Sequence, residues 1–358
     1  MNQVFAGFSS DKQNEYIRED YIHIYGVSFF CTFLALKRKL NPELASVIGM
    51  LHDVYRLKTG INNYHNVSGA EMSRIILRDM NIFIDDEKQI ILSAIYHHSD
   101  KAHIHNEYDE LLKDADLFQS FMKTGACKLH ISHLPRLKNL AEELSIAIDF
   151  DSITVYRDEP SVAKSIDKRN LLAQFAEELA SGPIAGSRED PVYMNLIRYW
   201  PEDSAFDELK NGWCAAFVYH CCQEAGFVFP IKWRPDTLRF ACVAAWNTWA
   251  RENNYFIESS PDFIPERGDI VLYRNIVPPE NKKEEQRNVP IDHIGIVLGS
   301  EAGQFTVAEG NVNNQNVSGI LTRPLHQNIE GYIRIDNNLK YDGWKYEYKG
   351  DASWQAKN

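Results

Sequence analysis

The stretch LNPELASVIGMLHDVYRL, residues 40–57, decides the fold class of the first half of the chain. Its apolar residues recur at near-helical spacing, at Leu44, Val47, Ile48, Leu51 and Val54. Asn41-Pro42 stands where a helix would begin. Similar spacing continues over residues 68–80, 87–97 and 108–122. The first 150 residues therefore predict an all-α domain, with a polar His52-Asp53 pair near the end of one helix.

A change of composition follows this helical half. Residues 149–168 are polar and charged and contain Pro160, which favours a connection between two cores. The expected division is a first domain at 1–155, a linker at 156–167, a second domain at 168–336 and a tail at 337–358.

The second half predicts helices before strands. The expected helices are residues 170–179 and 213–225, and the expected strands are 269–273, 294–298, 305–308 and 331–335. This order favours an α+β domain. The charged insertion at 278–290 is interpreted as a solvated surface loop.

Composition limits the classes of function. The chain has 358 residues, 44% of them hydrophobic and 25% charged, which is the balance of a globular protein. Its formal net charge of −12 argues against a duplex nucleic-acid partner, because such proteins need a basic face. A nucleotide or small phosphate ester held through a metal is still compatible with that charge. The oligomeric state is not indicated.

The cysteines and the apolar stretches bear on the compartment. None of the six cysteines forms a CxxC pair, so reduced thiols are expected. Residues 1–8 lack the pattern of a secretory signal, and the longest apolar stretch, 26–36, is too short to cross a bilayer. These observations predict a cytoplasmic protein with no membrane partner.

The helical half contains a set of potential metal ligands. They are His23, His52, Asp53, His65, His97, His98, Asp114 and Asp116. Each histidine alone is more often a packing or surface residue. Together, imidazoles and carboxylates suit a divalent transition metal, and helices can project them into one bundle core. Such a metal activates water and binds a phosphoryl oxygen, which phosphoester hydrolysis requires.

These segments resemble the HD superfamily of metal-dependent phosphohydrolases over residues 16–135. The resemblance rests on residues 21–27, 49–53, 65–71, 95–101 and 113–116. It implies that one metal is held by His23, His52, Asp53 and Asp116. In two-metal members further histidines hold a second ion and the aspartate of the His-Asp pair bridges; His65, His97 and His98 stand at those places.

The same resemblance bears on substrate and cofactor. Lys101 is similar to a phosphate-orienting lysine of the family. The implied cofactor is divalent Mn, Fe, Mg, Co or Zn, and the implied substrate is a small phosphorylated molecule such as a nucleotide. The additional signature of cyclic-dinucleotide-cleaving members is missing, so that substrate is not implied.

The second half contains a potential thiol nucleophile. Cys214 stands at the start of a predicted helix, whose positive end stabilises a thiolate. A thiolate needs a base and an orienting group. His293 begins a predicted strand, and Glu309 and Asn311 follow the next one. The alternative for Cys214 is a buried structural thiol, the commonest state of a free cysteine.

These residues resemble the CHAP family, cysteine- and histidine-dependent amidohydrolases/peptidases of papain-like fold, over residues 168–336. The resemblance rests on residues 213–218, 267–271, 292–295 and 309–311. It implies Cys214 as nucleophile, His293 as base and Glu309 as the residue that orients His293. Asn311 is implied to assist orientation or the oxyanion. The implied substrate is a peptide or other amide.

Four functional hypotheses follow. The first is a bifunctional hydrolase with both sites active. The second is one catalytic domain regulated by ligand binding at the other. The third is a cell-wall amidase or endopeptidase exported without a Sec signal. The fourth, a binding scaffold with two inactive sites, is disfavoured by complete candidate sets in both halves.

Overall fold

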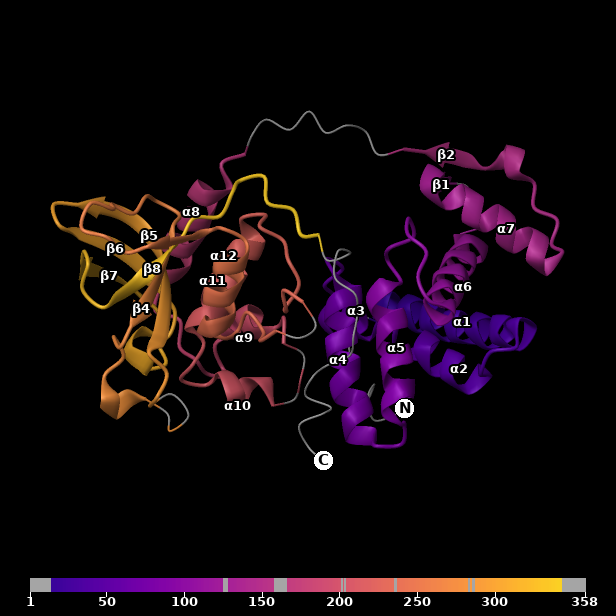
Figure 1. Cartoon of the computed structure of the whole chain (residues 1–358), viewed down its shortest axis with the longest axis horizontal. Coiled ribbons are helices and arrows are strands. Elements are labelled where there is room, and N and C mark those ends of the chain that lie inside the picture. The colour runs from indigo at the N-terminus through magenta and orange to yellow at the C-terminus, as the bar shows by residue number, and fades with distance from the viewer. Residues whose placement is uncertain are drawn as a thin grey trace. The chain divides into compact units, whose positions relative to one another are not determined.

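The protein is described from a computed structural model covering residues 14–124, 128–157, 166–200, 202, 204–234, 237–282, 284 and 287–342. Contacts divide the described residues into two compact units, one within 14–157 and the other within 166–342 (Figure 1). Much of the expected linker and of the expected tail lies outside the described residues.

The first unit is built mainly of helices. They are α1 (Asn14–Arg38), α2 (Pro42–Leu51), α3 (Val54–Thr59), α4 (His65–Met80), α5 (Asp85–His97), α6 (Glu107–Thr124) and α7 (Leu134–Leu144). A short parallel pair, β1 (Lys128–His130) and β2 (Thr154–Tyr156), accompanies them, with the 3₁₀ turns η1 (Ile131–His133) and η2 (Phe150–Ser152). The sequence prediction of a helical first half is confirmed, although the β pair was missed.

The opening stretch differs from the single helix that its spacing predicts. The Asn41 side chain accepts hydrogen bonds from the first amides of α2, as a helix N-cap does. The chain then breaks between α2 and α3 at His52 and Asp53, and Asp53 has non-helical backbone angles of φ −109° and ψ 13°. His52 still has helical backbone angles, so the deviation begins at Asp53, and periodicity alone does not reveal it.

Gly49 sets how closely α2 packs on α1. A Cβ atom at this position would lie 2.4 Å from the Cα atom of Ser28 on α1, a backbone contact that a side-chain rotation cannot relieve. Because His52 caps the end of α2 three residues after Gly49, the same close approach holds its Nε2 atom 3.2 Å from Nε2 of His23 on α1.

Gly49→Ala is therefore expected to destabilise the first unit by about 1–3 kcal/mol, the usual cost of overpacking. Gly69→Ala on α4 is the matched control, because its Cβ would meet nothing closer than 3.4 Å. Helix propensity alone favours alanine there. Urea unfolding followed by circular dichroism measures both variants, and an equal stability of Gly49→Ala and wild type would contradict the packing argument.

The second unit places helices against one antiparallel sheet. Its helices are α8 (Lys168–Ser181), α9 (Pro191–Ile197), α10 (Ala205–Leu209), α11 (Cys214–Glu224) and α12 (Val243–Glu252). Its strands are β3 (Phe256–Glu258), β4 (Ile270–Arg274), β5 (Ile291–Glu301), β6 (Gln304–Glu309), β7 (Gly319–Pro324) and β8 (Ile329–Ile333), in the spatial order β3-β8-β4-β5-β6-β7. The expected α+β class is confirmed; β3, β7, α9, α10 and α12 were not predicted.

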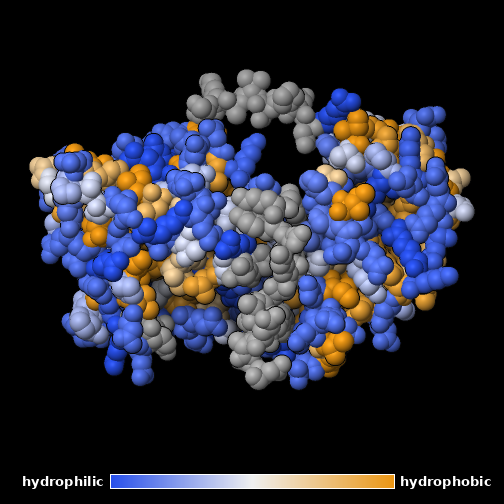
Figure 2. All heavy atoms as spheres, in the orientation of Figure 1, coloured by the Kyte–Doolittle hydropathy of each residue, from blue (hydrophilic) through white to orange (hydrophobic). Residues whose placement is uncertain are grey.

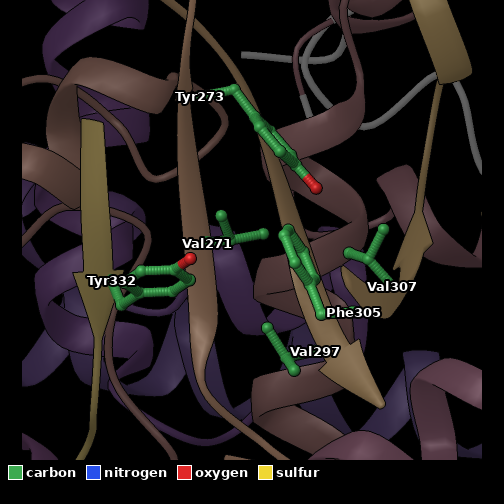
Figure 3. Close-up of a cluster of buried hydrophobic side chains, with 6 residues drawn as sticks. All are labelled: Val271, Tyr273, Val297, Phe305, Val307 and Tyr332. Carbon is green, nitrogen blue, oxygen red and sulfur yellow. The ribbon is translucent and has the colours of Figure 1, made fainter. Parts of the chain in front are cut away.

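The sheet has an apolar face made of alternate residues on neighbouring strands. Val271, Tyr273, Val297, Phe305, Val307 and Tyr332 form one buried cluster (Figure 3). Helices α8, α11 and α12 all contact β5. The packing of α11 against β5 and β6 brings the start of that helix to the strands that carry the candidate base.

The interpretation of residues 278–290 as a solvated loop is wrong for part of its length. Within the described residues, Lys282 forms an ion pair of 2.7 Å with Asp292, and both side chains are more than nine-tenths buried. Asn281 donates a hydrogen bond to the carbonyl oxygen of Asn313. Charge predicted exposure here, but the buried partner Asp292 compensates it and fixes the loop beside His293.

Two further expectations from the sequence are that the thiols are reduced and that no helix crosses a membrane. The five cysteines within the described residues are free, and Cys127 lies outside them. None of the helices in the described part of the chain is long and apolar enough to cross a membrane. Hydrophilic groups cover most of the visible face, with hydrophobic residues in smaller patches (Figure 2).

Candidate functional site

The candidate metal ligands of the first unit come from separate helices. His23 lies on α1, His52 and Asp53 lie at the break between α2 and α3, and Asp116 lies on α6. Two more lie nearby, since His65 begins α4 and His98 follows α5. The fold thus brings together residues nearly a hundred positions apart.

The ligand atoms form two groups that share one carboxylate. His23, His52 and Asp53 offer atoms within 4.8 Å of one another, and so do Asp53, His65 and His98. The Oδ2 atom of Asp53 lies 3.5 Å from the Nε2 atoms of both His23 and His52. Its Oδ1 atom lies 3.1 Å from Nε2 of His65 and 3.7 Å from Nε2 of His98. Each carboxylate oxygen therefore faces one group.

Hydrogen bonds at the opposite ring nitrogen orient the imidazoles. The Nδ1 atoms of His52, His65 and His98 lie 2.7–2.8 Å from backbone carbonyl oxygens, to which each can donate. Nδ1 of His23 lies 2.5 Å from Oε1 of Gln119. A proton held at Nδ1 leaves the Nε2 lone pair directed into the cluster, the arrangement found in ligating histidines.

The electrostatics favour the ligand-competent forms of most of these groups. Burial lowers the pKa of His52 to about 4 and lowers that of His98, so both are neutral at neutral pH. Burial opposes ionisation of Asp53, but His52, His65 and His98 hold its pKa well below the ordinary value. Burial also opposes ionisation of Asp116, but Lys101 and His23 hold its pKa well below the ordinary value. Burial lowers the pKa of His23, but Asp116 and Asp53 more than offset it.

The residues fit a bound cation. Asp53 is 4% exposed, yet its Oδ1 atom makes no hydrogen bond within the described residues. A buried carboxylate oxygen without a donor is costly unless a cation binds it. Asp116 adds a second carboxylate, with Oδ1 3.4 Å from Nε2 of His23.

Two cationic side chains adjoin the same carboxylates. Arg56 forms an ion pair of 2.6 Å with Asp53, and Lys101 forms one with Asp116. Both cations line a pocket of about 590 Å³ together with His23, Asp53 and Asp116. Arg56 gave no sequence signal beyond its position three residues after Asp53.

His97 differs from its predicted place as a metal ligand. Its Nδ1 atom pairs with Oδ2 of Asp109 at 2.9 Å, and its ring stacks on His105 with centroids 4.0 Å apart. Neither group of potential ligands in the described residues includes it. Adjacent helical residues point about 100° apart, so His97 and His98 cannot both face the cluster.

This difference between neighbours makes a sharp test. His98→Gln should reduce the bound metal from two ions to one per chain, because it removes an Nε2 ligand from the second group. His97→Gln should leave the stoichiometry unchanged. Elemental analysis after saturation with manganese measures both. An equal loss in the two variants would contradict the assignment of His98 to the second group.

In the second unit, three side chains converge from a helix and two strands. Cys214 is the first residue of α11, His293 lies near the start of β5, and Glu309 ends β6. Nε2 of His293 lies 3.1 Å from Oε2 of Glu309, which as a carboxylate accepts a hydrogen bond from Nε2–H. The Nδ1 atom of His293 is buried and has no hydrogen-bond partner in the described part of the chain. This leaves Nδ1 able to exchange a proton with a thiol.

The charges of this triad support one another. Burial lowers the pKa of His293, but the charges of Cys214 and Glu309 outweigh it and raise that pKa to about 10. Burial opposes ionisation of Glu309, but His293 and Arg323 lower its pKa to about 2. The arrangement therefore stabilises the imidazolium form of His293 beside the carboxylate of Glu309.

Arg323 is a residue of this site that the sequence did not predict. From β7 it donates to Glu309 through Nη2 at 2.8 Å and Nε at 3.2 Å. This two-point contact fixes the carboxylate plane. The ring of Tyr273 stacks on that of His293 with centroids 5.9 Å apart, and the Arg323 guanidinium lies over the same tyrosine ring at 5.7 Å. No motif marked Arg323, because β7 was not predicted and its pairing with β6 creates the contact.

Asn311 lies next to the triad but is turned into its own loop. Its backbone is left-handed, with φ 53°. Its Nδ2 donates to Oδ1 of Asn314, and its Oδ1 accepts from the backbone of Asn316. No hydrogen bond joins it to His293 among the described residues. Because Asn316 in turn accepts from Nε1 of Trp213, Asn311 shapes the loop beside the residue preceding Cys214.

The titration of His293 is the measurable consequence of this geometry. Folding raises the pKa of His293 from about 6.5 in the unfolded chain to about 10. The folding stability that protonated His293 contributes is therefore fully present below a pH of about 6.5 and is lost as the pH rises through about 10. Glu309→Gln should lower the midpoint, since one anionic neighbour is removed. NMR of the imidazole, assigned with His293→Gln, measures it, and Glu301→Gln on the exposed end of β5 is the control. An unchanged midpoint in Glu309→Gln would contradict the coupling.

Comparisons with known proteins identify two domains in the chain. The family model described as HD domain matches residues 20–120, and the one described as CHAP domain matches residues 206–311. Searches of curated proteins and of solved structures gave no match. HD domains bind divalent metals, and the two families imply phosphoester and amide or peptide substrates. The chain thus carries an HD domain followed by a CHAP domain and is an enzyme of the hydrolase class.

Proposed function

We propose that the chain is a bifunctional hydrolase, with metal-dependent phosphoester hydrolysis at the HD site and amide or peptide hydrolysis by Cys214. The observation that carries the proposal is that both halves assemble a full set of chemical groups. Asp53 is shared by two ligand groups in the first half. His293 has one nitrogen on Glu309 and the other without a partner in the second.

At the HD site, His23, His52, Asp53 and Asp116 would hold one divalent ion, and Asp53, His65 and His98 a second. When bound, such ions activate water and neutralise charge on a phosphoryl oxygen. The chain's own contribution is to orient the ligands through their Nδ1 hydrogen bonds. Lys101 and Arg56 now pair with Asp116 and Asp53. If those carboxylates bind a cation, both side chains become available to orient the phosphate.

The pocket lining bears on the substrate class. Its described residues are four carboxylates, three cationic side chains, four imidazoles and two serines. No aliphatic, phenyl, phenol or indole side chain is among these described residues, and three of the four imidazoles, those of His23, His65 and His98, are proposed metal ligands. Stacking on an aromatic ring is the usual source of sequence-independent base affinity. The lining therefore favours a small hydroxylated phosphate ester, such as a sugar phosphate, over the nucleotide that the family resemblance suggested.

At the CHAP site the proposed steps follow cysteine chemistry. The Cys214 sulfur attacks the carbonyl carbon, and the His293 imidazolium donates its Nδ1 proton to the departing amine as the C–N bond breaks. Water then attacks the thioester and gives one proton to His293, and the C–S bond breaks to release the carboxylic acid and regenerate the Cys214 thiolate beside the His293 imidazolium. Glu309 keeps Nε2–H oriented, and Arg323 holds Glu309.

The domain division is part of the proposal. Residues 1–155 and 168–336 would act as separate domains, since each proposed set of site residues lies within one of them. The regulatory alternative, in which ligand binding at one site changes turnover at the other, is the second candidate. The export of a wall-cleaving enzyme has no specific observation in its favour.

A matched pair of substrates tests the proposal. Purified protein with manganese should release phosphate from ribose 5-phosphate at least tenfold faster than from AMP, which carries the same phosphoester plus a base. Chelation should stop the reaction. The amide activity should appear on a panel of peptides and acyl amides and should resist chelation. Faster turnover of AMP would reject the sugar-phosphate class, and turnover at neither site would reject the bifunctional assignment.

A further inference from the structure

Helix α1 (Asn14–Arg38) is apolar on two opposite faces. One face is buried in its own domain and carries Ile24, Val27, Cys31 and Leu34. The other face carries the α1 stripe, which we define as the five exposed side chains Ile22, Tyr25, Phe29, Phe33 and Leu36. Phe29 is 71% exposed and Leu36 is 64% exposed. Helices that are apolar on all sides are normally covered on all sides.

The stripe is straight and continuous. Its members follow one another at spacings of three, four, four and three residues, which keeps them within one narrow face of a helix. Over the fourteen residues from Ile22 to Leu36 the stripe runs about 21 Å. Five contiguous apolar side chains are a different feature from the single exposed ones that every protein has.

The order of spacings reads the same in both directions. If a second α1 lies antiparallel with a two-fold axis at Phe29, then Ile22 faces Leu36 of the other copy and Tyr25 faces Phe33 of the other copy. Phe29 then faces its own counterpart. A two-fold interface requires such self-complementarity, because the same patch occurs on both sides.

The charges at the two ends of α1 agree with the same arrangement. Glu19 lies three residues before Ile22, and its side chain is 59% exposed although it also contacts Lys123. Lys39 lies three residues after Leu36 and is exposed. The antiparallel arrangement places the end of α1 that carries Glu19 beside the end of the other copy that carries Lys37 and is followed by Lys39, so ends of opposite charge lie together. A parallel arrangement would place like charges together.

The area is adequate for a pair of copies. A large aromatic side chain buries roughly 150–250 Å², so five half-exposed side chains offer on the order of 500 Å² per copy. Two copies together would bury on the order of 1,000 Å², which is near the lower limit for a specific interface.

We infer that the α1 stripe is the interface of a two-fold symmetric dimer, in which two copies of this chain pair antiparallel through α1. The partner is a second copy of this chain, because the spacing of the α1 stripe and the charges at the ends of α1 are each complementary to themselves under a two-fold axis. The inference does not depend on either catalytic activity.

Sedimentation velocity of the full chain over a range of concentrations tests the dimer. Wild type should dimerise reversibly, and Phe29→Glu should weaken dimerisation at least tenfold, since two carboxylates would meet on the axis. Ile104→Glu is the matched control, because Ile104 is 86% exposed on the same domain outside the stripe. Glu19→Lys should weaken the dimer, and adding Lys39→Glu should restore it.

Cysteine substitution tests the register. Phe29→Cys should form a disulfide-linked dimer under mild oxidation above the wild-type background. Ile22→Cys alone should not, because its two copies would lie about 21 Å apart along the pair. A wild-type chain that stays monomeric at every concentration overturns the inference, whatever else binds the stripe. Equal cross-linking of both cysteine variants overturns the antiparallel register, and circular dichroism confirms that each variant is folded.

Discussion

Asp53→Ala is expected to lower metal affinity by at least about 100-fold and to abolish phosphate release. Even residues that merely orient metal ligands cost 10–100-fold in affinity when replaced. Asp53 is shared by both ligand groups, with one carboxylate oxygen facing each. A single substitution should therefore remove both ions together, whereas His98→Gln should remove one. Elemental analysis and isothermal titration with manganese measure the two losses.

The control must separate a lost ligand from a damaged core. Asp109→Asn replaces another buried carboxylate of the same domain, which pairs with His97 outside both groups. Asp53→Asn and Asp109→Asn, made as separate variants, introduce the same chemical change at two carboxylates that are both almost fully buried. Asp109→Asn should keep two ions per chain. Full metal occupancy in folded Asp53→Asn and Asp53→Ala would show that Asp53 is not a ligand.

Cys214→Ala is expected to reduce amide hydrolysis by roughly 10⁴-fold or more, since removal of a nucleophile costs about that much or more in comparable triads. The thiol is 4% exposed at the start of α11, and His293 directs an unpaired nitrogen into the same site. Cys214 should also be the first thiol labelled by limiting iodoacetamide. Cys221 and Cys222 are fully buried, and burial raises their pKa values.

Cys242→Ala is the matched control for the thiol. Cys242 is exposed, but burial of its sulfur raises its pKa, so it should react more slowly than Cys214. Cys242→Ala should keep the amide activity. First labelling at Cys242, or full activity in Cys214→Ala, would remove Cys214 from its role as nucleophile.

The two variants also test whether the sites act independently. Asp53→Ala should leave the labelling rate of Cys214 unchanged, and Cys214→Ala should leave phosphate release unchanged, because the two sets of site residues share no member and independent sites usually behave additively. A change at one site caused by the variant at the other would favour the regulatory alternative. Such coupling requires two states that a ligand binds with different affinity.

The sequence alone determined the two fold classes and most of the chemical groups. Helical spacing around residues 40–57 predicts helices because side chains every three to four residues share a face. The order of His23, His52-Asp53 and Asp116 indicated metal chemistry because those residue types bind cations. The CHAP-like residues 213–218 and 292–295 indicated thiol chemistry by the same kind of reasoning, from residue type and local position.

Only the tertiary structure decided how those groups face one another. Periodicity could not show that the chain breaks at His52 and Asp53. It also could not show that His98 and not His97 faces the cluster, because the sequence does not indicate which of two adjacent histidines points toward it. Arg323 gained its role through the pairing of β7 with β6, and Lys282 was buried by its partner Asp292. Contacts between strands and loops distant in sequence leave no local pattern, since their energy comes from partners that only the folded chain brings together.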